Sequence, residues 1–369
     1  MFTLTNYWWL LIWLFTGGVF LNYVYPKRYE MVCGKRERRW RMGPAVALVV
    51  PYVIWAGWRT DIGDTYNYRR GFLNISMDIG TWGEYLASKT KDTGFSVLTL
   101  LIKFFAKDSA VMYFLILAAI QIGCMVYLFR KYSCNYWMSI FIFIASGDYI
   151  SWNFNGIRQF TAVMIVYAAT DWMLQKKYLR VILVILLAST VHGSSILMIP
   201  VVFLVQGKPW NKWMILGLFV SLIALVYVNQ FTDILDVLLQ DTQYINVVSD
   251  WKNFGDDGMN PIRAMVYAVP SVVSLMGFKY IKYENAPVIN FCVNASIIST
   301  AIAIIATGTS GIFIGRLPIY VSLYANCILL PWEVENLFAD RIARFVKVGA
   351  VFCYLAFFYY QMHFAWAMI

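Results

Sequence analysis

The sequence predicts an all-α membrane protein that crosses the bilayer many times. Of its 369 residues, 60% are hydrophobic and only 14% are charged, and the mean hydropathy is +0.61. Soluble domains are about 45–50% apolar and about 25% charged, so this chain has more apolar surface than a soluble fold can bury. Apolar runs recur along the whole chain without a compositional break. We therefore expect a single integral membrane domain over residues 1–369.

Ten apolar runs are long enough to span a bilayer, which takes about 17–25 mostly apolar residues per helix. The first should remain in the protein as a helix, because no basic leader precedes it and no small-residue cleavage signal follows it. The ten predicted spans cover residues 4–25, 42–58, 110–130, 135–151, 156–174, 212–229, 261–279, 286–306, 316–332 and 346–366.

Basic residues predict the orientation of these helices, since Lys and Arg collect in cytoplasmic loops. The segment PKRYEMVCGKRERRWR at 26–41 has seven basic residues against two glutamates, so we place it inside. Alternate loops then put further basic clusters on the same side: Arg130/Lys131, Lys176/Lys177/Arg180, Lys208/Lys212, Lys279/Lys282 and Arg341/Arg344/Lys347. The formal charge of +10 is thus explained by membrane orientation, and we expect no nucleic-acid partner.

The apolar block 181–205 needs a separate interpretation, because a single crossing would reverse the side of every later loop. Two half-helices that enter and return, turning at His192–Gly193–Ser194, restore the pattern. Each half would rise only about 18 Å, at about 1.5 Å per residue, so the turn would lie within the membrane beside a polar cavity. The alternative is that this block spans once and another span is miscounted.

Two long segments are predicted on the outer side. Residues 59–109 include IGTWGEYLASKT and GFSVLTLLIKFFAK, which are too short and too charged to span and are typical of amphipathic interfacial helices. Residues 230–260 are acidic and aromatic and suit a loop that contacts sugars.

No motif for a metal or a cofactor is present. The six cysteines form no CxxC pair, and the chain has only two histidines and no Gly-rich phosphate loop. We therefore predict neither a metal site nor a cofactor.

Two arginines on the predicted outer side mark a candidate anion site. Arg158 lies in NFNGIRQF, where Asn155 is expected to cap a helix, and Arg316 lies in GRLP, at the start of the tenth span. Helix N-termini favour anions through their free N–H groups and partial positive charge, and a guanidinium adds a fork that fits phosphate oxygens. Arg59 is in reach of the same side. A salt bridge or a lipid contact is the alternative for each arginine.

Three side chains are candidate bases. His192 lies at the predicted break inside the membrane, where ionisable residues are costly and tend to be functional. Asp61 and Asp64 are three residues apart in WRTDIGDTYNYRRGF (58–72), where they could either take a proton from a hydroxyl group or pair with nearby arginines. The candidate substrate contacts that adjoin these groups are Tyr68, Gln159, Ser194 and Tyr320.

Four stretches, in order, resemble the EpsG-type family of Wzy-like polysaccharide polymerases. They are WRTDIGDTYNYRRGF (58–72), DTGFSVLTLLIKFF (92–105), FNGIRQFTAVMIVYA with KKY and STVHGSSILMIPV (154–202), and GRLPIYVSLYANCILLP (315–331). The family pattern has a glutamate where Asp92 stands, so the resemblance assigns this acid no role.

The resemblance implies a bacterial plasma-membrane glycosyltransferase whose active site faces the exterior. It would join oligosaccharide repeat units linked to undecaprenyl diphosphate, in contact with membrane lipids and with a chain-length regulator and a flippase as partners. The first outer loop is also similar to that of lipid-dependent membrane glycosyltransferases, which suggests a GT-C-like architecture. Two other functions stay open: a flippase or transporter for lipid-linked glycans, and a membrane O-acyltransferase built on His192.

Overall fold

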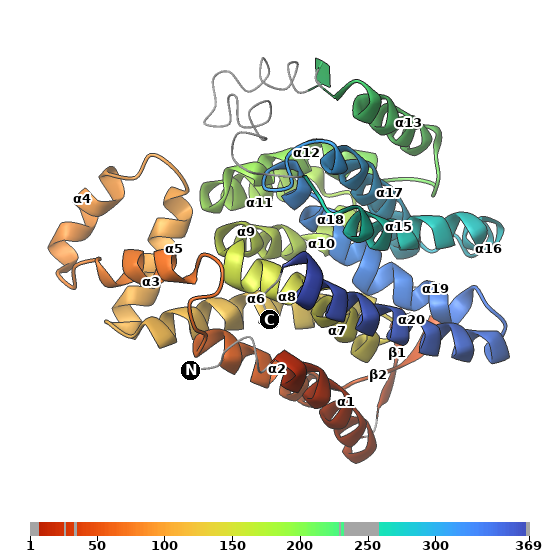
Figure 1. Ribbon diagram of the computed structural model, residues 1–369, viewed down its shortest axis with the longest axis horizontal. Coiled ribbons are helices and arrows are strands. Elements are labelled where there is room, and N and C mark those ends of the chain that lie inside the picture. The colour runs from red at the N-terminus through yellow and green to blue at the C-terminus, as the bar shows by residue number, and fades with distance from the viewer. Residues whose placement is uncertain (1–6, 26, 33–34, 229, 232–257, 367–369) are drawn as a thin grey trace. The chain divides into compact units, whose positions relative to one another are not determined.

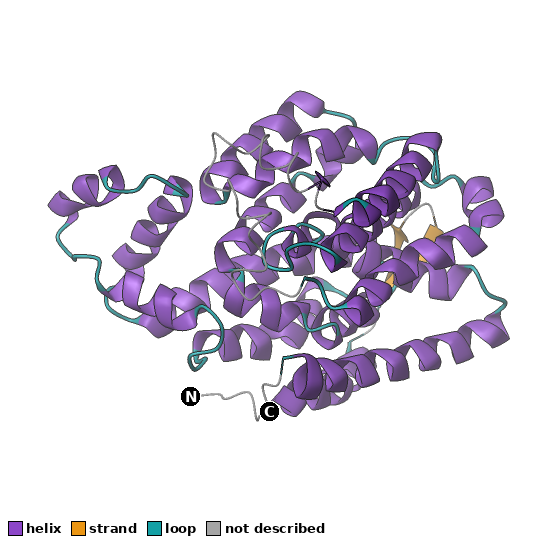
Figure 2. Cartoon of the chain, turned by 45° about the horizontal axis from the view of Figure 1, so that its top comes forward, coloured by secondary structure: helices purple, strands orange, loops and turns teal. Residues whose placement is uncertain are grey.

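The computed structural model describes residues 7–25, 27–32, 35–228, 230–231 and 258–366. Helices make up most of the described chain, and two short strands form its one described sheet (Figures 1 and 2). The all-α class is therefore confirmed. The predicted outer loop 230–260 lies mostly outside the described residues.

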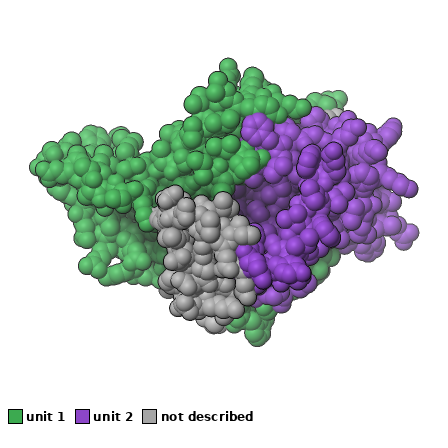
Figure 3. All heavy atoms as spheres, turned by 90° about the horizontal axis from the view of Figure 1, so that it is seen from above, with its two compact units in different colours: residues 1–200, 348–369 green, residues 201–347 purple. Residues whose placement is uncertain are grey.

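The chain has two compact units, which are coloured separately in Figure 3. Unit 1 comprises residues 1–200 and 348–369, and unit 2 comprises residues 201–347. The elements wholly in unit 1 are α1 Tyr7–Val24, β1 Arg28–Val32, β2 Lys35–Arg39, α2 Met42–Gly57, α3 Thr65–Leu73, η2 Ile79–Thr81, α4 Trp82–Ala87, α5 Thr93–Ala106, α6 Ala110–Tyr132, α7 Tyr136–Ala145, α8 Asp148–Ile150, η3 Ser151–Asn155, α9 Ile157–Ala168, α10 Thr170–Leu174, α11 Tyr178–Val191, η4 Gly193–Leu197 and η8 Gln361–Ala365.

Unit 2 is built around the long buried helix α17. Its elements are α13 Lys212–Val226, α15 Pro261–Met276, α16 Phe278–Glu284, α17 Pro287–Thr307, η6 Ile314–Arg316, α18 Ile319–Leu323, η7 Tyr324–Leu329 and α19 Leu330–Asn336. Helices α12 Met198–Leu204 and α20 Asp340–Tyr360 each contain a boundary between the units. Helix α17 packs against α13, α15 and the stretch from η6 to η7.

Five described helices are long and apolar enough to cross a membrane, and a sixth span results if one bent pair is counted. The five are Tyr7–Val24, Ala110–Tyr132, Pro287–Thr307, Ile314–Asn336 and Asp340–Ala365. The bent pair is Pro261–Met276 with Phe278–Glu284, at an angle of 73°. The predicted count of ten is not confirmed, because the remaining predicted spans coincide with shorter helices. One of them, α7, ends at Ala145 because Gly147 takes a left-handed φ of 75°.

The break predicted at His192 is confirmed. Helix α11 ends at Val191, His192 is extended with φ −155° and ψ 118°, and a new helical turn begins at Gly193. The return of the second half toward the outer side stays a prediction. The two predicted amphipathic segments in 59–109 are also helical, as η2 with α4 and as α5, whereas α3 was not predicted.

Basic loops that the sequence places on one side gather at one end of unit 1. Strands β1 and β2 pair in antiparallel register beside the last turn of α6. At the same end, Asp171 of α10 accepts hydrogen bonds from Lys131 and Tyr132. At the opposite end of α6, α3 and α5 pack against its first turns. This arrangement agrees with the predicted alternation of loops, and which end faces the cytoplasm stays a prediction.

Candidate functional site

The loop between α2 and α3 is held in place by Arg59. Its side chain is 2% exposed, and it donates to the carbonyl oxygens of Ala56 and Asn153, both at 2.5 Å. Its guanidinium also lies 4.3 Å from the ring centres of Phe114 and Phe154. Burial lowers the pKa of Arg59 to about 9. This guanidinium faces backbone and rings, which favours a structural role over the predicted substrate contact.

Gly63 lets this loop lie against η3. Its φ of +57° is a left-handed conformation that glycine adopts without strain. A Cβ at this position would lie 3.1 Å from the Cβ of Asn155 and 3.3 Å from the Phe154 carbonyl oxygen. Asn155 ends a π-helical turn, and Gly156 is the residue that precedes α9. The prediction that Asn155 caps this helix is therefore wrong.

Asp61 pairs with an arginine of α3. Arg69 Nη1 lies 2.5 Å from Asp61 Oδ1, and its Nη2 donates to the Arg59 carbonyl oxygen at 3.3 Å. The alternative that the sequence left open for Asp61, pairing with an arginine, is thus the arrangement that the structure shows.

A cavity of about 350 Å³ opens beside α3, α5 and the start of α9. Its charged and phenolic lining comes from Asp64, Tyr68, Tyr85, Lys89, Lys91, Asp92, Tyr113 and Arg158. Asp64 directly precedes α3 and is half-buried at the wall. A cavity with three cations, two acids and several rings is chemically suited to a ligand that carries both anionic groups and sugar hydroxyls.

Arg158 is held at this cavity by Asp92 and Tyr68. Its Nη1 lies 2.7 Å from Asp92 Oδ2, and its Nε donates to the Tyr68 hydroxyl at 3.1 Å. The Arg158 side chain is 44% exposed, whereas that of Asp92 is 10% exposed. Arg158 is the second residue of α9, as the sequence predicts. Asp92 therefore holds Arg158 in place, while much of the arginine side chain remains exposed to solvent.

His192 approaches the same carboxylate. Its Nδ1 lies 3.6 Å from Asp92 Oδ2, and it directly follows α11. This proximity depends on Gly94, because a Cβ there would lie 2.1 Å from Thr190 Oγ1 and 2.9 Å from the Thr190 backbone carbon. Only glycine allows the start of α5 to come this close to the end of α11.

The surroundings of Asp92 favour its ionised form. Burial raises the pKa of Asp92, but the proximity of His192 and the charge of Arg158 outweigh burial and lower the pKa below its ordinary value. Asp92 is therefore an anion at neutral pH, which matches its position between two basic side chains.

The other predicted contacts lie around this cluster or in unit 2. Gln159 and Ser194 are 6% and 7% exposed, in α9 and η4, and neither lines the cavity. In unit 2, Arg316 ends η6 in the first turn of the candidate span Ile314–Asn336, as predicted. Tyr320 follows it in α18 and is 3% exposed. Within the described ranges, no three His, Cys, Asp or Glu side chains are grouped as metal ligands.

The sequence interpretation missed three charged residues of the cavity: Asp92, Lys89 and Lys91. The family pattern has a glutamate at this position, so the resemblance gives Asp92 no role. Its position just before the apolar helix α5 was the available signal, since acids favour helix N-termini. The lysines gave no such signal, because they lie in a polar connection whose folding cannot be read from spacing.

A family comparison identifies the chain. The EpsG family model matches residues 44–367, which includes the cavity, the His192 break and the Arg316 turn. The chain belongs to the EpsG family. This EpsG protein is thus a membrane protein of the polysaccharide polymerase type, as the four quoted stretches predict. Comparisons with curated proteins and with solved structures gave no match.

Proposed function

We propose that this EpsG protein is a glycosyltransferase that joins undecaprenyl-diphosphate-linked oligosaccharide repeat units at the outer face of a bacterial plasma membrane. The observation that supports this most directly is the cavity of about 350 Å³ with Arg158, Lys89 and Lys91 in its wall. A leaving diphosphate needs cations of this kind, and electrostatic stabilisation of developing charge is often the largest single catalytic contribution.

In the proposed reaction, an acceptor hydroxyl attacks the anomeric carbon of the donor's first sugar. The new bond joins the acceptor oxygen to this carbon, the bond from the carbon to the phosphate oxygen breaks, and the lipid diphosphate leaves with its electrons. Arg158 neutralises the leaving group, and Asp92 and Tyr68 position Arg158 through the contacts described above. Arg316 stays a second candidate for a phosphate contact.

The acceptor proton must pass to a base. Asp64 is the better placed of the predicted bases, since it lines the cavity, whereas Asp61 is engaged by Arg69. His192 stays the second candidate, and in that case Asp92 would orient its ring. No metal takes part in the scheme that we propose.

An apolar groove in the same unit suits the isoprenoid chain of the substrate. It has a volume of about 670 Å³ and lies between α1 and α2, where Trp9, Ile12, Pro51 and Ile54 are among its lining residues. Its α2 side is the last part of that helix before the Arg59 loop. Burying isoprenoid carbons there contributes about 0.8 kcal/mol per CH₂, while the diphosphate stays at the level of the loop.

Incubation of the purified protein with lipid-linked repeat units tests the proposal against the two alternatives. A ladder of lengthened glycans, formed equally in the presence of a chelator, supports the polymerase. Translocation of the lipid across vesicles without new bonds indicates a flippase or transporter. Acyl transfer to the glycan indicates an O-acyltransferase.

A further inference from the structure

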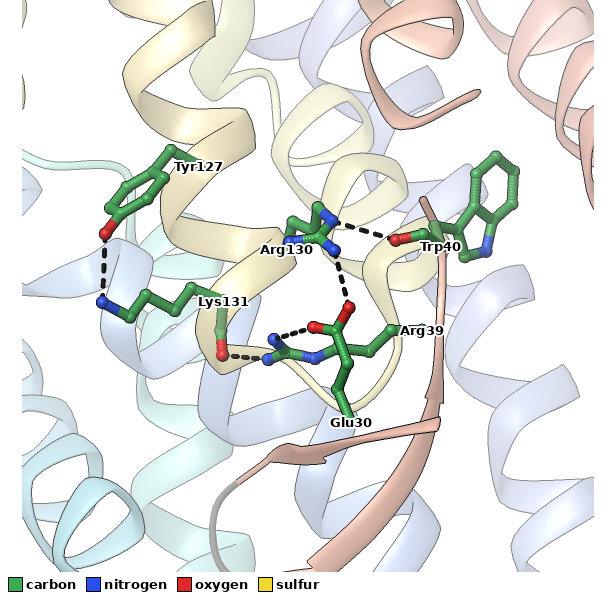
Figure 4. Close-up of polar contacts among 6 residues, drawn as sticks. All are labelled: Glu30, Arg39, Trp40, Tyr127, Arg130 and Lys131. Carbon is green, nitrogen blue, oxygen red and sulfur yellow. Dashed lines mark hydrogen bonds and ion pairs between the residues drawn. The ribbon is translucent and has the colours of Figure 1, made fainter. Parts of the chain in front are cut away.

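The hairpin formed by β1 and β2 is fixed to α6 by one of its faces. Glu30 accepts from Arg39 Nη1 at 3.3 Å and from Arg130 Nη2 at 2.9 Å (Figure 4). Arg39 also donates to the Lys131 carbonyl oxygen, and Arg130 Nε donates to the Trp40 carbonyl oxygen at 2.9 Å. These contacts join both strands to the last turn of the helix, so the hairpin is a positioned element and not a loose basic loop.

The opposite face of the hairpin is exposed, and its side chains contact one another. Side chains alternate between the faces of a strand, and the register pairs Tyr29 with Arg38 and Met31 with Arg36. Tyr29 and Met31 are 55% and 68% exposed. Arg38 Nε donates to the Tyr29 hydroxyl at 3.1 Å, and the guanidinium groups of Arg36 and Arg38 lie 5.0 and 5.4 Å from the Tyr29 ring centre. Two arginines are thus arranged around one ring.

The short connections of the two strands to α1 and α2 keep this face close to the membrane surface. Strand β1 begins at Arg28, shortly after α1 ends at Val24, and β2 ends at Arg39, shortly before α2 begins at Met42. A five-residue strand extends only about 16 Å, at about 3.3 Å per residue. The exposed face therefore remains within reach of lipid headgroups, where tyrosine rings and arginines are the preferred interfacial side chains.

We propose that the face formed by Tyr29, Met31, Arg36 and Arg38 is a binding site for anionic phospholipid headgroups. The phosphate would lie between the two guanidinium groups, which match its oxygens, and the Tyr29 ring and Met31 would contact the glycerol and upper acyl region. Exposed Lys27 and Arg41, just outside the two strands, add positive charge. The proposal does not depend on the reaction proposed above.

Native mass spectrometry of the purified full chain tests this site, with phosphatidylglycerol and phosphatidylcholine as the probes. At about 1 kcal/mol for each arginine at a membrane surface, the R36Q/R38Q variant should bind phosphatidylglycerol about 10- to 30-fold more weakly. The R341Q/R344Q variant is the matched control. It removes two exposed arginines from another predicted inner loop, so its net charge equals that of R36Q/R38Q. It should bind within about threefold of the wild type.

Two outcomes would overturn the proposal. In one, the two double variants lose phosphatidylglycerol equally, which would mean that only net charge matters. In the other, R36Q/R38Q binds phosphatidylglycerol like the wild type. A changed oligomeric state of that variant would then identify this face as a protein interface. Unchanged thermal unfolding of R36Q/R38Q would show that a loss of binding is not a loss of fold.

Discussion

Replacing Arg158 with alanine should greatly slow glycan polymerisation while leaving the protein folded. The ion pair with Asp92 is short at 2.7 Å, but the arginine side chain is 44% exposed, so solvent screens much of the attraction. Exposed ion pairs contribute up to about 1 kcal/mol to stability, and we expect the free energy of unfolding to fall by no more than this. If Arg158 stabilises the leaving diphosphate, its loss should lower kcat by about 10²- to 10³-fold.

A double-mutant cycle with Asp92→Asn separates the catalytic role of Arg158 from the role of Asp92 in positioning it. Asp92→Asn removes the negative charge that holds Arg158 and should lower the rate by a smaller factor, through poorer positioning. The double variant should have the rate of Arg158→Ala alone, because Asp92 acts through the arginine. Arg70→Ala is the matched control, an exposed arginine of α3 that does not line the cavity. A rate for Arg158→Ala within about threefold of the wild type, per folded molecule, would refute the assignment.

Three further predictions follow from the same geometry. Gly94→Ala should cost about 1–3 kcal/mol of stability by overpacking and should lower activity, whereas Gly83→Ala, whose Cβ meets open space, should not destabilise the protein in thermal unfolding. Ile54→Trp should raise KM for long-chain but not for short-chain lipid diphosphates, whereas Val50→Trp, one turn away and equally exposed, should change neither value. Because the pKa of Asp92 is lowered in the folded protein, the stability that it contributes should be fully present above its ordinary pKa of 3.8 and lost as pH falls through the lower folded value. Unfolding of Asp92→Asn and the wild type should therefore converge in that acid range, and a constant difference down to pH 2 would contradict the shift.

The fold class and several element boundaries could be predicted because they depend on local pattern. Long apolar runs predicted α6 and α17, and the small, polar sequence HGSS predicted the break after α11. The two-stranded hairpin was missed, since its sequence is dominated by charges and its pairing is stabilised by the distant side chain of Arg130.

The sequence predicted the arginines of the candidate site, but it did not predict the side chains that contact them. Arg158 was identified from its place at a helix start, which is a local property. The burial of Arg59 was not, because it depends on Phe114 and Phe154 from two distant elements. The contact of Asp92 with Arg158 and His192 likewise depends on the packing of α5 against α11, which Gly94 permits and which no spacing in the sequence reveals.

The central claim is that this EpsG protein forms glycosidic bonds at the cavity that contains Arg158. The most direct measurement is the glycan ladder made by purified wild type and by Arg158→Ala from the same lipid-linked repeat unit, at equal amounts of folded protein. The account predicts a regular ladder from the wild type and only the starting repeat unit from the variant. Ladders of equal length and rate from both proteins would contradict it.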